Sequence, residues 1–201
     1  MPELRKETAV LVTGTPGTGK TTVSRLLAKK LRASYVNPRI LLRREGIDYV
    51  YDRKRRTRVV SLKRLDQALG KYTARADRGM VIDSHIALET GSLPRLARAI
   101  VLRCDPVILE RRLKRKRWSK SKIGENLLAE ILDICLWDAV RSYGWNRILE
   151  IDTTGKRPHY VIQLVMRDLK KRRIQERSKV DWLSSLKRRR ILSNYVNEGR
   201  N

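Results

Sequence analysis

The sequence lacks the features of a secreted or membrane protein. Its 201 residues include no phenylalanine and only two cysteines, Cys104 and Cys135. The cysteines are far apart and lack metal-ligand spacing, so each is expected to pack as a small buried group rather than to form a disulfide. No run of about 18 apolar residues is present, which argues against a transmembrane helix. The first ten residues, MPELRKETAV, contain no apolar signal-peptide core, so an intracellular protein is expected.

Acidic residues are scarce relative to basic ones. The chain has 47 Lys and Arg against 21 Asp and Glu, which gives a net charge of +26. Such an excess predicts attraction to polyanions, through release of counterions from a nucleic-acid backbone. The alternative is the highly charged surface of a heat-adapted protein, with which abundant Lys, Arg and Glu agree. That trend enriches both signs of charge, so by itself it does not produce +26.

The most specific motif lies in Leu11–Thr22, LVTGTPGTGKTT, where an apolar strand leads into a glycine-rich turn and then a helix. Gly14, four intervening residues and then Gly19-Lys20-Thr21 fit the phosphate-binding P-loop pattern. Small residues let successive backbone N–H groups surround a triphosphate, and the following helix directs its positive end at the same anion. We expect Lys20 to reach the β- and γ-phosphates and the Thr21 hydroxyl to ligate Mg²⁺.

Apolar segments that alternate with helical periodicity predict a doubly wound parallel sheet with the P-loop after its first strand. The expected strands are 9–12, 34–36, 79–83, 99–103 and 148–151. The expected helices begin after the P-loop and then cover 39–44, 61–72, a segment opened by Pro106, 121–140 and 160–169. Residues 47–60 are strongly basic and predict a loop or short hairpin. The third strand delivers Asp83-Ser84-His85 at its carboxyl end, the edge where open α/β sheets bind ligands.

The composition changes after Lys170. Two basic tetrads flank a segment that holds Trp182, Leu183 and Leu186. The pattern predicts a mobile or loosely docked basic tail over 171–201 with room for one short helix. Basic residues interleaved with an aromatic suit a nucleic acid or an acidic partner, and a solvated helical extension is an equally good interpretation.

Four stretches together resemble the adenylate kinase isoenzyme 6 family over about residues 8–170. They are GTPGTGKTTVSRLLAKKL, YVNPRILLRRE, VIDSHIALE and RWSKSKIGENLLAEI. The resemblance implies a P-loop NTPase fold with a five-stranded sheet of the nucleoside monophosphate kinase type. It also implies an NMP-binding segment at about 36–59 and a lid at about 115–125. The activity it implies is ATP:AMP phosphotransfer with Mg²⁺, accompanied by ATP hydrolysis.

The same resemblance assigns roles to individual residues. Asp83 would hold the metal together with Thr21, and His85 would position the hydrolytic water. Arg43 would bind a nucleotide phosphate, and Lys116 and Arg117 of the lid would act on the transferring phosphoryl group. The remaining implied nucleotide-binding residues belong to the P-loop: Gly14, Gly17, Thr18, Gly19, Lys20 and Thr22.

The resemblance further implies a role in maturation of the small ribosomal subunit. The implied partners are a ribosomal protein of the subunit platform and rRNA or a pre-ribosomal particle, with the chain itself a monomer or in a transient heterodimer. The expected location is the cytoplasm of an archaeon, or the nucleus if the source is eukaryotic.

Two departures from the family pattern leave the phosphate acceptor open. Residues 39–43 read RILLR where the family has Gly-Asp-Leu-Ala before a basic residue, and the lid reads Lys116-Arg117-Trp118 where the family has Arg-Gly-Tyr or Arg-Gly-Trp. An ammonium does not grip a phosphoryl group at two points as a guanidinium does. One alternative is therefore a nucleotide-switched binding factor with negligible AMP phosphorylation. Another kinase of the same fold, acting on a nucleoside or on shikimate, is a further alternative.

Overall fold

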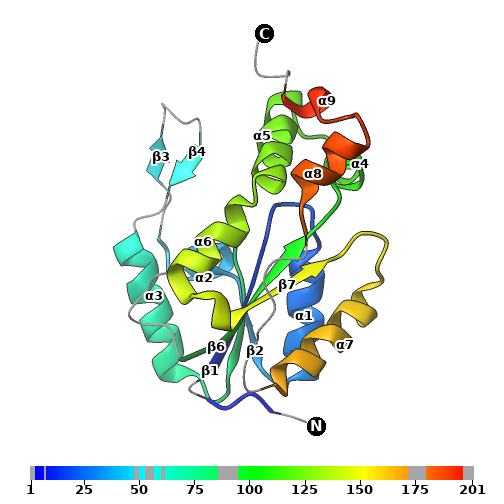
Figure 1. Ribbon diagram of the computed structural model, residues 1–201. Helices are drawn as coiled ribbons and strands as arrows, with labels where there is room; N and C mark the ends of the chain where they lie inside the picture. Colours follow the sequence, from blue (N-terminus) through cyan, green and yellow to red (C-terminus); the bar gives the residue numbers. More distant parts are fainter. Residues whose placement is uncertain are drawn as a thin grey trace.

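A five-stranded parallel sheet forms the centre of the protein, in the strand order β2-β5-β1-β6-β7 (Figure 1). The computed structural model describes residues 3–6, 8–47, 50–52, 57–59, 62–85, 95–171 and 180–196. The strands of the sheet are β1 (Thr8–Thr13), β2 (Ser34–Val36), β5 (Met80–Asp83), β6 (Arg95–Arg103) and β7 (Ile148–Asp152). Neighbouring strands run parallel throughout, so the predicted doubly wound sheet is confirmed.

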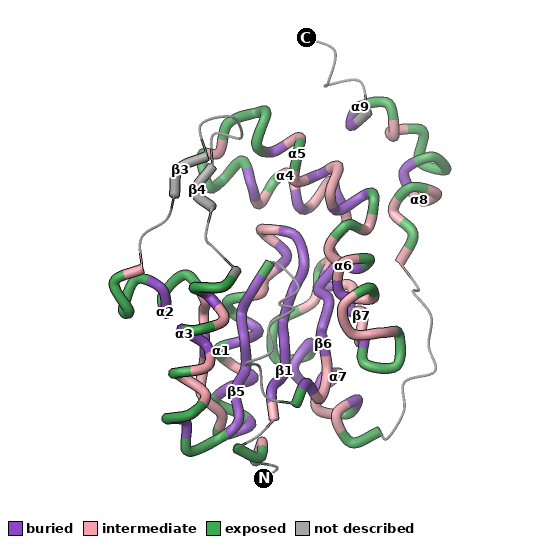
Figure 2. The backbone as a smooth tube through the Cα atoms, turned by 90° about the vertical axis from the view of Figure 1, so that its left-hand side faces the viewer, coloured by how far each residue is buried: buried purple, intermediate pink, exposed green. Residues whose placement is uncertain are grey.

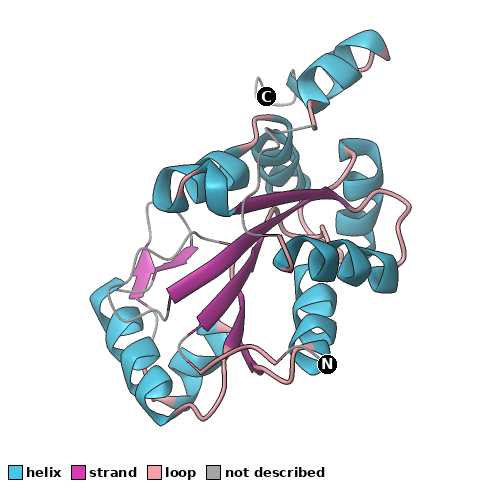
Figure 3. Cartoon of the chain, turned by 60° about the horizontal axis from the view of Figure 1, so that its bottom comes forward, coloured by secondary structure: helices cyan, strands magenta, loops and turns pink. Residues whose placement is uncertain are grey.

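Helices cover both faces of this sheet (Figure 3). The helices of the described residues are α1 (Lys20–Lys30), α2 (Pro38–Arg44), α3 (Leu62–Arg75), α4 (Pro106–Arg115), α5 (Lys120–Ile131), α6 (Ile134–Tyr143), α7 (Pro158–Leu169), α8 (Trp182–Arg188) and α9 (Ser193–Val196), with a 3₁₀ turn η1 (Trp145–Arg147). Of these, α1, α2, α3, α6 and α7 pack on the sheet. In the part of the chain that the structure describes, no helix combines the length and apolarity needed to cross a membrane.

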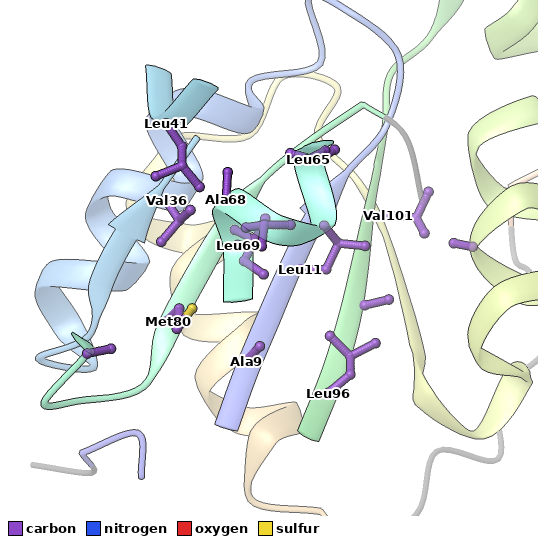
Figure 4. Packing of buried hydrophobic residues seen from close by; sticks show 14 of the residues in the cluster. Ala9, Leu11, Val36, Leu41, Leu65, Ala68, Leu69, Met80, Leu96 and Val101 are labelled. Atoms are coloured by element: carbon purple, nitrogen blue, oxygen red, sulfur yellow. The ribbon is translucent and has the colours of Figure 1, made fainter. Parts of the chain in front are cut away.

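Alternate residues of each strand enter different apolar clusters. On β1, Ala9 and Leu11 pack with α2, α3 and α6, whereas Val10 and Val12 pack with α1 and α7. Figure 4 shows the first of these clusters, and Figure 2 shows that the central strands are buried. Because both faces of the sheet are covered, the middle parts of the central strands are apolar on both sides, as residues 9–12 and 99–102 are. Packing on both faces therefore holds the carboxyl ends of the strands in fixed positions.

A short antiparallel hairpin follows α2. Its strands are β3 (Val50–Asp52) and β4 (Thr57–Val59), which pair in register from Val50 with Val59. The hairpin falls within the basic segment 47–60, for which a loop or short hairpin was expected. Residues 48–49 and 53–56 of the expected NMP-binding segment lie outside the described residues.

The helix predicted over 121–140 is wrong as a single element. The structure breaks it between α5 and α6 at Leu132 and Asp133, where Asp133 adopts a left-handed conformation with φ 59°. In that conformation the Asp133 carboxylate pairs with the guanidinium of Arg103, at the end of β6. A continuous helix would forgo this partly buried ion pair, so a contact far away in sequence favours the boundary at Asp133.

The expectation of a mobile or loosely docked tail is also wrong for residues 180–196. Two helices, α8 and α9, lie there beside α4 and α5 at the top of the molecule (Figure 1). Leu186 is fully buried in a cluster with Leu109 and Leu113 of α4 and with Ile123 of α5. Residues 172–179, which contain part of the first basic tetrad, are outside the described part.

The two cysteines do not pair with each other, as expected, but only one of them is fully buried. Neither Cys104 nor Cys135 forms a disulfide, and Cys104 is buried. Burial raises the pKa of the Cys104 thiol to about 11, so it is protonated at neutral pH and packs as an apolar group.

Candidate active site

The loop between β1 and α1 has the backbone shape of an anion-binding cradle. Gly14, Gly17 and Gly19 have φ angles of 132°, 98° and 103°. A Cβ atom on Gly14 would lie 2.3 Å from the Leu102 carbonyl oxygen, and one on Gly17 would lie 2.8 Å from a methyl group of Leu109. Only glycine combines these angles with such close neighbours. Helix α1 then starts at Lys20 without a side-chain cap, which leaves its first N–H groups to an anion.

Lys20 is folded back over this loop. Its ammonium donates to the carbonyl oxygens of Gly14, at 2.7 Å, and of Thr15, at 3.1 Å. Desolvation by burial holds the pKa of Lys20 below its ordinary value, although Cys135 and Asp83 act in the opposite direction. A triphosphate in the loop would supply the negative charge that this partly desolvated ammonium lacks.

Asp83 lies at the carboxyl end of β5, directly beside the loop. Its Oδ2 atom accepts from the Thr21 hydroxyl at 2.8 Å, the Tyr35 hydroxyl at 2.8 Å and the Asn37 amide at 3.2 Å. The aspartate is only 4% exposed, so its orientation is fixed by these three donors. Its contact with Thr21 brings together the two residues that sequence analysis expected to hold a metal.

Tyr35 and Asn37 are site residues that the sequence analysis missed. Burial and the hydrogen bond to Asp83 raise the pKa of Tyr35. Asn37 also caps α2, because its Oδ1 atom accepts from the N–H groups of Arg39 and Ile40. One asparagine thus links Asp83 to the helix that opens the expected NMP-binding segment. The sequence feature that could have identified them is their position at the end of β2, because β2 pairs with β5 and both strands end at the same edge of the sheet.

The donor set of Thr21 and Asp83 fits Mg²⁺. A hydroxyl and a carboxylate are hard oxygen ligands, and Mg²⁺ usually takes one or two carboxylates together with phosphates. Within the described ranges, no group of three or more His, Cys, Asp and Glu side chains is placed to hold a metal ion. When ATP is bound, its phosphate oxygens would add to the ligands that Thr21 and Asp83 supply.

A cleft of about 450 Å³ extends from the P-loop. Its walls come from the P-loop and the start of α1, the end of α4, and the loop between β7 and α7. The residues that line it are Gly17, Thr18, Gly19, Lys20, Thr21, Thr22, Val23, Arg112, Lys116, Thr153, Lys156, Pro158 and Val161. Most of the residues expected to bind the triphosphate therefore line one cavity, with three further cations beside Lys20.

The structure separates the two lid cations that the sequence paired. Lys116 lines the cleft, whereas Arg117 is exposed on the α4–α5 turn with φ 55° and does not line it. Arg112, one turn before Lys116 on α4, supplies the guanidinium in the cleft and donates to the Gly17 carbonyl oxygen at 3.3 Å. Helical spacing of four residues puts Arg112 and Lys116 on one face.

The other expected residues lie at the margins of the site. Gly14 forms the start of the loop and touches Lys20 through its carbonyl oxygen. Arg43 is exposed in the last turn of α2 and does not line the cleft. His85 is at the exposed end of β5, where desolvation and the charges of Lys20 and Arg39 lower its pKa. A lowered pKa favours the neutral form of the imidazole.

If the cleft binds ATP, replacing Arg112 by alanine should lower kcat/KM for phosphoryl transfer by about 10- to 100-fold, since a guanidinium that lines the cleft beside the P-loop is lost. The matched control is Arg111→Ala, because Arg111 is the exposed neighbour on the same helix. Steady-state kinetics with varied ATP measures both. A larger loss in Arg117→Ala than in Arg112→Ala would instead favour the sequence-based assignment of Arg117.

This fold, a parallel sheet with a P-loop after its first strand and a cationic cleft above it, defines a P-loop protein of the kinase type. Solved structures agree: the chain superimposes on a gluconokinase from Sinorhizobium meliloti with a TM-score of 0.53 at 17% identity, covering 82% of this chain and 93% of that one. The shikimate kinase of Aquifex aeolicus gives a TM-score of 0.52 at 14% identity, with coverages of 80% and 95%. At these identities the likeness concerns the fold alone.

Sequence comparison is more specific. Residues 10–133 match the family described as an AAA domain. A protein of Thermococcus kodakarensis named "Putative adenylate kinase" is 34% identical over 86% of this chain and 92% of its own length. A protein of the same name from Pyrococcus furiosus is 37% identical, with coverages of 78% and 81%. The chain belongs to this adenylate kinase-like family.

Proposed function

We propose that the protein is a nucleotide kinase that transfers the γ-phosphoryl group of Mg·ATP to AMP, and that it also hydrolyses ATP slowly. The observation that carries the proposal is the cleft lined by Lys20 of the P-loop and by Arg112 and Lys116, next to Thr21 and Asp83. The names of the archaeal relatives support the nucleotide kinase part. The finer assignment, to the isoenzyme 6 branch, rests on the motifs that include Asp83-Ser84-His85.

Phosphoryl transfer needs positioning and charge neutralisation more than covalent chemistry. Lys20 would neutralise the β- and γ-phosphates, while Arg112 and Lys116 close the site from the side of α4. Thr21 and Asp83 would hold Mg²⁺, which when bound offsets charge on the same oxygens. His85, just beyond Asp83, would accept a proton from an attacking water when no acceptor nucleotide excludes it.

An acceptor screen tests this proposal, because gluconokinase and shikimate kinase share the fold. With Mg·ATP present, we expect AMP to accelerate ADP formation at least about tenfold, with two ADP formed per ATP consumed. Gluconate, shikimate and nucleosides should leave the slow basal hydrolysis unchanged. Acceleration by one of these small molecules and none by AMP would refute the assignment of the acceptor.

A second candidate function follows from the charge. A net +26 exceeds what a metabolic kinase needs, and exposed cations such as Arg43 and Arg117 lie away from the cleft. In this alternative, ATP hydrolysis switches a factor that binds rRNA, a small-subunit platform protein or a pre-ribosomal particle. ATP hydrolysis that is indifferent to AMP but stimulated by small-subunit particles would support it. Stimulation by AMP alone would support the kinase.

A further inference from the structure

The C-terminal helical pair, residues 180–196 with α8 and α9, is packed against α4, which borders the cleft, and against α5. Helix α4 carries Arg112 and ends just before Lys116, and α5 follows after a short turn. Both α8 and α9 contact α5 (Figure 1). The pair therefore lies behind the lid, on the side away from the P-loop.

A polar chain of contacts runs from this pair to the P-loop. The Trp182 indole N–H donates to Glu130 Oε1 at 3.0 Å, and the same oxygen accepts from Arg103 Nε at 2.9 Å. The Arg103 carbonyl oxygen in turn lies 2.8 Å from the Thr153 hydroxyl, which is also 3.0 Å from the Thr18 carbonyl oxygen. All of these groups except Trp182 are at least 96% buried or are backbone atoms within the site.

An apolar path reaches the same loop. Leu186 is fully buried against the cluster that contains Leu109 and Leu113 of α4. A Cβ atom on Gly17 would lie 2.8 Å from Leu109 and 3.1 Å from Leu113, so both leucines also lie close to the P-loop. Helix α4 is thus held between the P-loop on one side and α8 on the other.

An ion pair fixes the start of the same helix. Arg189 donates to Asp105 Oδ2 at 2.5 Å, while Asp105 Oδ1 caps α4 through the Val107 N–H at 2.8 Å. The C-terminal pair therefore contacts α4 at its cap and along its apolar face, and contacts α5 at Glu130.

We propose that the C-terminal helical pair positions α4, and with it Arg112 and Lys116, over the phosphates of ATP. Trp182 and Arg189 are positioning residues that act through Glu130 and Asp105 and do not touch the nucleotide. The inference deepens the proposed function, since it assumes that the cleft binds ATP.

The test uses the full chain and calorimetric titration with Mg²⁺ and a non-hydrolysable ATP analogue. Trp182→Phe, which keeps an aromatic ring and removes the N–H donor, and Arg189→Gln should each weaken binding about three- to tenfold, as substitutions within a coupled network do. Arg189→Lys, which keeps the charge, should restore most of the affinity. Leu183→Ala and Arg188→Gln are matched controls, because both side chains are exposed on α8 and should leave affinity unchanged.

A double-mutant cycle separates positioning from simple destabilisation. In the Arg112→Ala background, Arg189→Gln should weaken binding by less than about twofold, because Arg189 contacts the cap of α4 and its effect passes through that helix and its guanidinium. Unchanged affinity in both single variants, or full additivity with Arg112→Ala, would overturn the inference. Since Arg189 is partly exposed, its variants keep the test valid if Trp182→Phe does not fold. Absence of analogue binding by the wild-type chain would instead refute the proposed function.

Discussion

Replacing Lys20 by alanine is expected to lower kcat for phosphoryl transfer by about 10²- to 10³-fold, the range found when a preorganised electrostatic group is removed from a site. The ammonium is already partly desolvated and is held by the carbonyl oxygens of Gly14 and Thr15. It would therefore meet bound phosphates with little reorganisation of solvent.

The matched control for this substitution is Lys29→Ala, in the exposed last turn of the same helix. It should keep the wild-type rate. Initial rates of ADP formation at saturating ATP, together with the melting temperature of each variant, provide the comparison. A Lys20→Ala variant that retained more than about a tenth of the wild-type rate would show that the P-loop is not the catalytic site.

Replacing Arg103 by methionine is expected to destabilise the fold by about 3–5 kcal/mol, the cost of leaving buried charges without their partner. The Arg103 side chain is 1% exposed and pairs with Glu130 at 2.9 Å, Glu150 at 2.7 Å and also Asp133. Burial acts to lower the pKa of Arg103, but the carboxylates outweigh it and the pKa is raised. Without the guanidinium, three carboxylates would face one another.

Equilibrium unfolding in urea measures this effect. Arg95→Met is the matched control, because Arg95 is exposed at the beginning of the same strand, and it should change the free energy of unfolding by less than about 0.5 kcal/mol. Equal stability of Arg103→Met and wild type would mean that this network does not hold α5, α6 and β7 together. The contacts of Arg103 would then also not couple Trp182 to Thr18.

Local sequence patterns were sufficient for the sheet and the P-loop. Strand β1 is continuously apolar because both of its faces are buried, and the glycines of the loop are required by positive φ angles and close neighbours. Such requirements act on single residues and their immediate neighbours, so they are visible in a sequence. The contact of Asp83 with Thr21 could also be expected, because adjacent parallel strands end at the same edge.

What could not be predicted depends on contacts far apart in the chain. The break at Asp133 exists because Arg103 attracts its carboxylate, and no periodicity marks it. The choice of Arg112 over Arg117 depends on how α4 packs on Gly17, since four arginines in this segment have the same local chemistry. The docking of α8 depends on the burial of Leu186, and the basic composition of the surrounding segment gives no indication of that burial.

The fate of the γ-phosphate tests the central claim most directly. In a single turnover, the protein is mixed with ATP labelled in its γ-phosphate, Mg²⁺ and excess AMP, and the products are separated. The proposed kinase predicts that the label appears in the β-phosphate of ADP, and that this transfer is lost in Lys20→Ala. Label found in inorganic phosphate alone, at the same rate with and without AMP, would contradict it.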